Sequence, residues 1–162
     1  MKDFLEVNLT RGYKTLIDKD DFLLLNCYSW QSKIIEGKIY AKTAYRINGK
    51  LKTFYLHRII ANAKSGEYVD HINGNPLDNR RNNLRICTNA QNIRNSKIKL
   101  NNKTGYKGVQ QLPSGNWRSR LTFNYKSINL GVFKNIIEAA KAYDQGAVKY
   151  FGKFARINSY GT

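Results

Sequence analysis

The sequence predicts an α+β protein that contains two small domains. Three observations support this fold class. Short runs of β-branched and aromatic residues fill the first 56 positions, residues 68–92 follow a strand–turn–strand–helix order, and three further strand-like runs precede a long amphipathic stretch at 136–151. Strands and helices therefore occur in blocks rather than in strict alternation, which is typical of α+β folds.

The N-terminal third of the chain is rich in strand signals. Residues 14–17 and 37–43 carry the β-branched and aromatic side chains of short strands. An Asn-Gly pair at 48–49 favours a tight hairpin, because both residues tolerate a positive φ. Residues 51–56 are therefore expected to form the returning strand, and residues 57–63 a short helix.

The central segment has the order strand, loop, strand, helix. Residues 68–72 and 84–87 are expected to form the two strands, and the Asn-Gly-Asn-Pro run at 73–76 is a turn signal. Thr88 and Gln91 have the spacing of a capping box, in which the two side chains satisfy backbone N–H groups at a helix start. A helix should therefore begin there.

The C-terminal segment predicts a small sheet packed on one helix. Residues 106–111, 116–123 and 126–133 are expected to form three strands. Apolar residues recur at helical spacing over 136–151, and Gly152 follows where a C-cap glycine is expected. The apolar face of this helix would cover the apolar face of the sheet.

The chain is strongly basic. Its 162 residues include 28 Lys and Arg against 11 Asp and Glu, a formal net charge of +17. No acidic residue lies between Asp78 and Glu138, although that segment holds 12 Lys and Arg. Because a solvated surface usually mixes both signs, a long acid-free stretch indicates a surface that faces a polyanion. A basic face retained for solubility is the alternative.

The composition excludes several classes of protein. A hydrophobic content of 41% argues against disorder, and no apolar run approaches the about 20 residues of a membrane span. Acidic residues interrupt the apolar stretch at Met1–Glu6, unlike a secretory signal. Cys27 and Cys87 are too far apart in sequence for a CxxC zinc site or a disulfide framework. We therefore expect a cytoplasmic protein without membrane or small-molecule ligands.

An acid–histidine pair at Asp70 and His71 is the strongest chemical signal. Neighbouring strand residues point to opposite faces, so these two can converge only where the strand ends at the following turn. Asp70, the amide oxygen of Asn92 and phosphate oxygens could then hold a hard cation such as Mg²⁺ or Mn²⁺. A histidine with a pKa of about 6.5 is suited to accept a proton from water. A structural role is the alternative, and His57 is expected to be structural or to contact phosphate.

A known family matches these residues. The run VDHINGNPLDNRRNNLRICTNAQNIRN, with Leu56-His57-Arg58 upstream, resembles the HNH endonuclease motif of phage and intron homing enzymes. The resemblance covers residues 52–96 and implies a ββα-metal core that holds one divalent metal ion. It implies that His71 is the general base, that Asp70 and Asn92 bind the metal, and that Asn83 orients the base. Many HNH enzymes have His where this chain has Asn92.

The C-terminal segment has a resemblance of its own. TGYKGVQQLPSGNWRSRLTF, INLGVF and EAAKAYDQGAVKYFGKFARIN, within residues 104–158, resemble the plant ethylene-response-factor DNA-binding domain. The family lays a three-stranded sheet in the major groove and packs a helix behind it. The scaffold residues match, whereas this chain departs from the family at the groove-contacting positions Lys107, Gln110, Leu112, Ser114, Thr122, Ser127 and Asn129. The DNA sequence preference of the plant proteins is therefore not carried over.

The candidate DNA contacts are basic or polar residues near these two motifs. Alternation along the strand at 116–123 places Arg118, Arg120 and Thr122 on the face opposite the apolar residues. Arginines beside the nuclease-like loop and cations of the linker would contact phosphates. The complete set is Arg58, Arg80, Arg81, Arg85, Arg94, Lys97, Lys99, Lys107, Gln110, Arg118, Arg120 and Thr122.

The sequence thus predicts a β-rich extension at 1–51, an HNH core at 52–96, a basic linker at 97–103 and a DNA-binding domain at 104–160. The expected activity is metal-dependent hydrolysis of double-stranded DNA, of the homing type, in a bacterial or phage-infected cell. One active site per chain predicts that a monomer nicks one strand, and that double-strand cutting needs dimerisation or two events. The competing hypothesis is a transcription regulator whose nuclease unit is vestigial.

Overall fold

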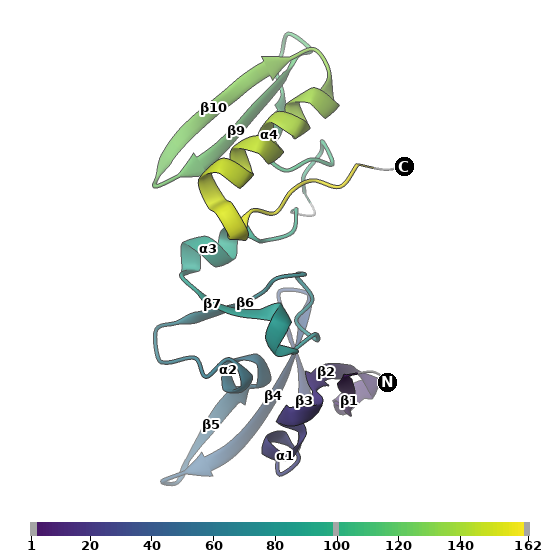
Figure 1. Ribbon diagram of the computed structural model, residues 1–162, viewed down its shortest axis with the longest axis vertical. Coiled ribbons are helices and arrows are strands. Elements are labelled where there is room, and N and C mark those ends of the chain that lie inside the picture. Colours follow the sequence, from purple (N-terminus) through teal and green to yellow (C-terminus); the bar gives the residue numbers. More distant parts are fainter. Residues whose placement is uncertain (1–2, 99–100, 161–162) are drawn as a thin grey trace. The chain divides into compact units, whose positions relative to one another are not determined.

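The structure is a computed structural model that describes residues 3–98 and 101–160. It combines small antiparallel sheets with short helices (Figure 1), which is compatible with the α+β class that the sequence predicts. The chain divides into two compact units, residues 1–92 and 93–162. Each unit has its own cluster of buried apolar side chains.

The first unit contains three antiparallel sheets, with strand orders β1-β2, β3-β4-β5 and β6-β7. Helix α3 begins in this unit and ends just beyond the division between the units. The elements are β1 (Phe4–Asn8), β2 (Lys14–Asp18), α1 (Phe22–Leu25), β3 (Gln31–Ile35), β4 (Lys38–Ile47), β5 (Lys50–Tyr55), α2 (Leu56–Ile60), β6 (Tyr68–His71), β7 (Leu84–Cys87) and α3 (Asn89–Arg94).

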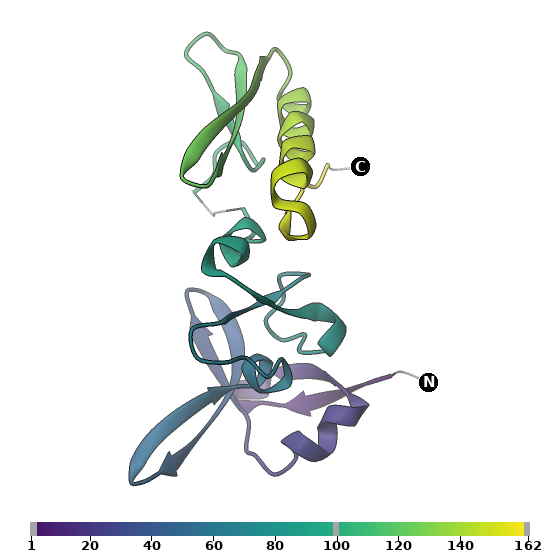
Figure 2. The ribbon, with the colours of Figure 1, turned by 60° about the vertical axis from the view of Figure 1, so that its left-hand side comes forward.

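Two local sequence signals are confirmed in this unit. Asn48 and Gly49 connect β4 to β5 with φ values of 50° and 74°, the turn expected for an Asn-Gly pair. Thr88 and Gln91 form the capping box at the start of α3, with N–H to side-chain oxygen distances of 2.8 and 3.2 Å. The β4–β5 hairpin projects from the body of the unit (Figure 2).

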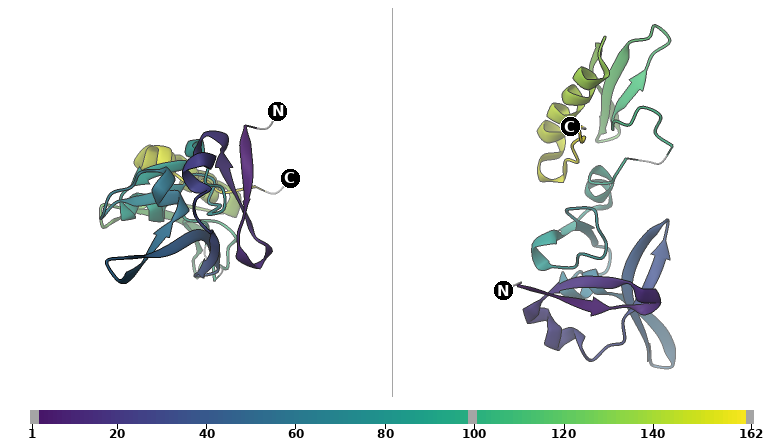
Figure 3. Two further views of the ribbon diagram at one scale, coloured as in Figure 1. Left: turned by 90° about the horizontal axis from the view of Figure 1, so that it is seen from below. Right: turned by 90° about the vertical axis from the view of Figure 1, so that its right-hand side faces the viewer.

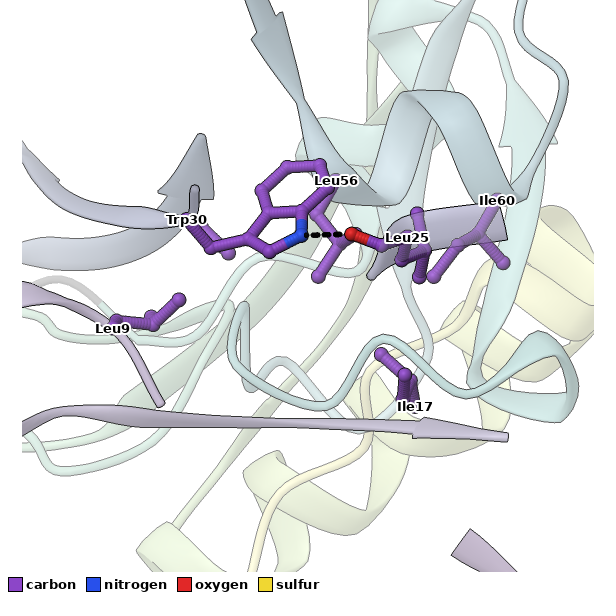
Figure 4. Close-up of a cluster of buried hydrophobic side chains, with 7 residues drawn as sticks. Leu9, Ile17, Leu25, Trp30, Leu56 and Ile60 are labelled. Carbon is purple, nitrogen blue, oxygen red and sulfur yellow. Dashed lines mark hydrogen bonds between the residues drawn. The ribbon is translucent and has the colours of Figure 1, made fainter. Parts of the chain in front are cut away.

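One hydrophobic core joins the N-terminal segment to the central motif. Side chains from the β-rich extension pack against Leu56 and Ile60 of α2 (Figure 4). Trp30 anchors this core and donates its indole N–H to the carbonyl oxygen of Leu25 at 3.0 Å. The buried members are Leu9, Ile17, Leu25, Trp30, Ala41, Leu56 and Ile60. Residues on both sides of the predicted boundary at residue 51 therefore share a single core.

The second unit is a three-stranded sheet packed on one long helix (Figure 3). Its strands, in the order β10-β9-β8, are β8 (Val109–Gln111), β9 (Trp117–Phe123) and β10 (Lys126–Phe133), and its helix is α4 (Ile136–Phe151). The side chain of Asn135 caps the helix by accepting from the N–H of Ile137 at 2.7 Å. The helix ends at Gly152, whose φ is 54°.

Gly108 explains why β8 begins three residues later than expected. Its φ is 76°, so the extended backbone of a strand cannot pass through this position. A Cβ atom here would lie 1.9 Å from the ring of Tyr143, which is buried on α4. Glycine therefore permits both the turn and the close approach of the helix.

The division between the units falls inside α3, before the basic linker that the sequence places at 97–103. The guanidinium of Arg94 lies over the rings of Phe123 and Phe151, at 4.9 and 5.1 Å from their centroids. Because of this packing, the last residues of α3 belong to the second unit.

Cys27 and Cys87 are free thiols. Within the described residues, no helix is long and apolar enough to cross a membrane.

Candidate active site

His71 lies at the end of β6, where the strand gives way to a turn. Its register partner on β7 is Leu84, and the preceding Asp70 lies opposite Arg85. The turn is held by the N–H of Gly74, which donates to the carbonyl oxygen of His71 at 2.8 Å. The His71 residue is only 7% exposed. The strand end therefore presents the imidazole in a fixed, largely dry position.

A chain of hydrogen bonds leads from His71 into the N-terminal hairpin. His71 Nε2 lies 3.1 Å from Asn79 Oδ1, and Asn79 Nδ2 donates to Thr15 Oγ1 at 2.7 Å. The Thr15 hydroxyl in turn donates to the carbonyl oxygen of Leu77 at 2.8 Å. Thr15 and Asn79 are 0% and 1% exposed. Neither residue was among the predicted site residues, because nothing in the sequence links β2 to this loop.

The role predicted for Asn83 differs from the contacts that it makes. Its Oδ1 accepts from the N–H of Asn73 at 2.9 Å, and its Nδ2 donates to the carbonyl oxygen of Asp78 at 2.7 Å. Asn83 therefore braces the loop between β6 and β7, and the side chain that holds the imidazole is Asn79. The physical reason is the turn at the end of β6, which folds the 73–78 loop onto Asn83.

His71 belongs to an aromatic cluster with His57, Tyr40 and Tyr55. The His57 ring centroid is 5.2 Å from that of His71, and the Tyr40 ring is 5.7 Å from His57 and 6.5 Å from His71. Tyr55 lies 5.7 Å from His57. Burial lowers the pKa of both histidines, and lowers that of His57 to about 3. Both imidazoles are therefore neutral at neutral pH.

Asp70 is held by Arg85. Its Oδ2 accepts from Arg85 Nε at 2.8 Å and also from Arg85 Nη2, and its side chain is only 5% exposed. Asn92 lies on α3, where its N–H donates to the carbonyl oxygen of Thr88. Both predicted ligands offer oxygen atoms, which suit Mg²⁺ or Mn²⁺. Over residues 3–98 and 101–160, no group of three His, Cys, Asp or Glu side chains gathers at one point.

The arginines predicted to contact phosphate in the first unit already have protein partners. Arg80 pairs with Asp78 and lowers the pKa of that carboxyl group, and Arg81 pairs with Asp21. Arg58 donates to the carbonyl oxygens of Lys64 and Glu67. With Arg85 on Asp70, four of the predicted contacts stabilise the fold of this unit in the structure.

Two of the predicted contacts in the second unit are also structural. Lys107 donates its ammonium to the carbonyl oxygens of Arg94 and Ser96 at 2.6 and 2.8 Å. Burial lowers the pKa of Lys107 to about 8. Since Arg94 packs on two phenylalanine rings, both cations bind the end of α3 to this unit.

The open face of β9 agrees with the predicted alternation. Arg120 and Thr122 are exposed, and Arg118 donates to the side chain of Gln110 at 2.8 Å. Ser119 and Leu121, which alternate with them, are buried. Lys97 is exposed, and Lys99 lies outside the described residues. The predicted contacts that remain on open surface in this unit are thus Lys97, Gln110, Arg118, Arg120 and Thr122.

Comparison with known proteins identifies the central segment. A family model described as HNH endonuclease matches residues 54–94. An uncharacterized HNH endonuclease of Acanthamoeba polyphaga mimivirus is 27% identical over 154 residues, covering 91% of this chain and 76% of the relative. Protein 3.8 of Escherichia phage T7 is 32% identical over 93 residues, covering 57% of this chain and 76% of the phage protein.

Shorter similarities connect the chain to plant proteins. An AP2/ERF and B3 domain-containing transcription factor of Arabidopsis thaliana is 41% identical over 54 residues, which cover 33% of this chain and 15% of the plant protein. An ethylene-responsive transcription factor of Medicago truncatula is 34% identical over 70 residues, or 29% of its length. No solved structure matches the chain.

Proposed function

Because the chain belongs to the HNH endonuclease family, we propose that this DNA endonuclease hydrolyses phosphodiester bonds with His71 as its general base. The observation that carries the proposal is the buried imidazole at the end of β6, held on one side by Asn79. A general base must be neutral and correctly oriented before substrate arrives. Burial supplies the first condition and the hydrogen bond the second.

The hydrogen-bond chain favours Nδ1 of His71 as the reacting nitrogen. Asn79 Nδ2 donates to Thr15 Oγ1 and to the carbonyl oxygen of Pro76, so Oδ1 is the atom that faces His71. An amide oxygen only accepts, and His71 Nε2 must therefore carry the proton. The lone pair of the neutral ring is then on Nδ1. His71 Nδ1 would remove the proton from a water that lies in line with the scissile P–O bond.

Asp70 and Asn92 would hold one divalent cation. Their oxygen atoms fit the preference of Mg²⁺ or Mn²⁺, and Mg²⁺ commonly keeps several waters beside one or two protein ligands. When bound, such a cation supplies positive charge that stabilises the developing charge on phosphate and on the leaving 3′ oxygen. Arg85 holds the Asp70 carboxylate in position, as outer groups do around metal ligands.

Plasmid relaxation tests this proposal. We expect the wild-type protein to convert supercoiled DNA to the nicked form with Mg²⁺ or Mn²⁺, and to lose this activity in EDTA. Substitution His71→Ala should lower the rate about 10²–10⁴-fold while DNA binding is retained, because only proton transfer is lost. Linear product at an early time would indicate double-strand cutting instead of nicking.

A variant of the second histidine, His57, serves as the control for His71→Ala. His57 packs beside His71 with 5.2 Å between the ring centroids, whereas Asn79 makes the hydrogen bond to His71 Nε2, so His57→Gln should lower the rate less than His71→Ala. The reverse order of the two losses would transfer the role of base to His57. If the wild-type protein binds DNA but does not cut with any divalent metal, the vestigial-nuclease hypothesis is the better one.

We also propose that the second unit binds DNA through the open face of β8-β9-β10. The exposed Arg120 and Thr122 support this proposal, as does the similarity to AP2/ERF transcription factors. Helix α4 covers the other face, so the sheet has one side available to a duplex. This unit would guide site choice, while the first unit cuts.

A further inference from the structure

The β3-β4-β5 sheet of the first unit has two different faces. Ser32, Ala41 and Thr43 are buried on the face that meets the hydrophobic core. The opposite face is named the basic face here, because its exposed or half-exposed positions include four cations. Strand alternation and the register of the sheet assign to it Lys33, Lys38, Tyr40, Lys42, Arg46 and Tyr55.

The basic face leads directly to the candidate active site. Tyr40 belongs to this face and lies against the His57 and His71 rings, at 5.7 and 6.5 Å between centroids. Lys38 precedes Tyr40 by two residues on β4 and points to the same side. Lys42 and Arg46 continue the same row toward the tip of the β4–β5 hairpin, which projects from the unit (Figure 2).

These cations differ from the arginines near the site because no carboxylate neutralises them. Arg80, Arg81 and Arg85 each pair with an aspartate. In the described ranges, none of the four basic-face cations forms an ion pair, and Arg46 donates only to the carbonyl oxygen of Gly49. Between Asp21 and Glu67 the sequence has eight Lys and Arg and a single acid, Glu36.

We propose that the basic face binds the phosphate backbone of the DNA duplex on one side of the cut. Tyr40, which lies against the histidines, is between Lys38 and Lys42 on β4. Arg46 is six residues beyond Tyr40 along the strand, so at about 3.3 Å per residue the row reaches about 20 Å from the candidate active site. This length corresponds to about six base pairs at about 3.4 Å each. Such contacts would position the scissile phosphate without selecting a sequence. The inference rests on cutting at His71, but its first test measures binding alone.

Two double variants on the same hairpin test the proposal. Lys42→Gln with Arg46→Gln removes two charges from the basic face, and Lys50→Gln with Lys52→Gln removes two from the other face. Both are made in the His71→Ala protein, and affinity for a 30-base-pair duplex is measured across salt concentrations. The first pair should reduce the slope of log K against log salt by about 1.8, since each phosphate contact contributes about 0.9. The second pair should leave the slope nearly unchanged.

A cutting assay gives an independent readout. In this assay, the DNA flank that the basic face covers is shortened to four base pairs from the cut. The shorter flank should weaken cleavage by the wild-type protein. It should have little further effect on the Lys42→Gln, Arg46→Gln protein. Equal slope changes in the two double variants would overturn the proposal, because they would indicate a general charge effect. An unchanged slope in the first pair would also overturn it.

Thermal unfolding checks that each variant is folded. If the Lys42→Gln, Arg46→Gln protein unfolds at a lower temperature than the wild-type protein, the single variants Lys42→Gln and Arg46→Gln replace it, and each should show half of the slope change. A failure of the general-base proposal would appear as retained cutting in His71→Ala, and the binding slopes would still report on the basic face. The two hypotheses therefore fail in different measurements.

Discussion

At the scale of single residues, the orientation of His71 depends on a side chain from another part of the chain. Thr15 precedes His71 by 56 positions, yet it supports Asn79, the residue that contacts the imidazole. Both supporting side chains are almost completely buried. Buried polar groups without a partner cost about 1–3 kcal/mol, so the chain of hydrogen bonds strongly favours one arrangement of the site.

Thr15→Val should therefore affect both stability and catalysis. It removes the hydroxyl that accepts from Asn79, and we expect the free energy of unfolding to fall by about 1–3 kcal/mol. The released amide no longer selects one tautomer of His71, so kcat should fall while KM changes little. Urea unfolding and steady-state cleavage measure the two effects. Thr15→Ser keeps the hydroxyl and should have a kcat close to that of the wild-type protein. Equal losses of kcat in the Thr15→Ser and Thr15→Val proteins would contradict the role assigned to the Thr15 hydroxyl.

The half-buried His57 predicts a dependence of stability on pH. Its pKa falls from about 6.5 in the unfolded chain to about 3 in the fold, chiefly because of burial. Between these values the unfolded state binds more protons, so acid favours unfolding. The free energy of unfolding should decrease by about 2 kcal/mol from pH 7.5 to pH 5. The lowered pKa of His71 acts in the same direction.

Urea titrations at these two pH values measure the loss. His57→Phe keeps an aromatic ring in the cluster but cannot be protonated, and it should show a smaller change with pH. A wild-type protein that is equally stable at pH 5 and pH 7.5 would show that the fold does not lower the pKa of His57.

At the scale of elements, two of the sheets with exposed cations serve different proposed purposes. One face of the β3-β4-β5 sheet carries a row of cations that passes beside the histidines. The β8-β9-β10 sheet carries Arg118, Arg120 and Thr122 opposite an apolar face covered by α4. Alternation along each strand is sufficient to separate the two faces.

Arg118→Ala with Arg120→Ala should weaken binding to the natural target site while leaving weak nicking of unrelated DNA. The reason is that the proposed active site lies in the other unit and remains intact. Competition binding and plasmid nicking measure the two properties. Lys141→Ala with Lys149→Ala, which removes two exposed charges from α4, is the matched control. Unchanged site preference in the first variant would exclude this sheet as the source of specificity.

At the scale of the whole molecule, the net charge of +17 does not measure the charge available to DNA, because some of the cations are held in ion pairs. Several arginines near the candidate site are neutralised by buried aspartates and contribute to folding. The basic face and the open face of β9 retain charge that is available to a polyanion. The total charge therefore overstates the number of phosphate contacts.

Binding should nevertheless weaken steeply with salt. Six phosphate contacts, shared between the two units, would lower affinity about a thousandfold between 50 and 200 mM salt, because each contact releases counterions. Fluorescence anisotropy with a labelled duplex measures the slope. A nearly flat response over this range would contradict a binding mode based on phosphate contacts.

Much of the fold was predictable because its signals are local. The Asn-Gly turn, the capping box at Thr88 and Gln91, and the alternation in β9 all act between residues close in sequence. The same is true of the strand-turn-strand-helix order around His71, on which the HNH resemblance depends. The general-base and metal-ligand assignments remain predictions, and they follow from that motif rather than from measured contacts.

The roles of Asn79, Thr15 and the arginines depend on contacts between distant segments. Nothing local distinguishes Asn79 from Asn83, and their partners are chosen by how the loop folds against β2. Likewise, a basic residue in the sequence can pair with phosphate or with a buried aspartate, and Arg80 and Arg85 show the second outcome. Local backbone preferences specify the elements, whereas the burial of polar groups, which must find partners, selects the residues that surround the histidine.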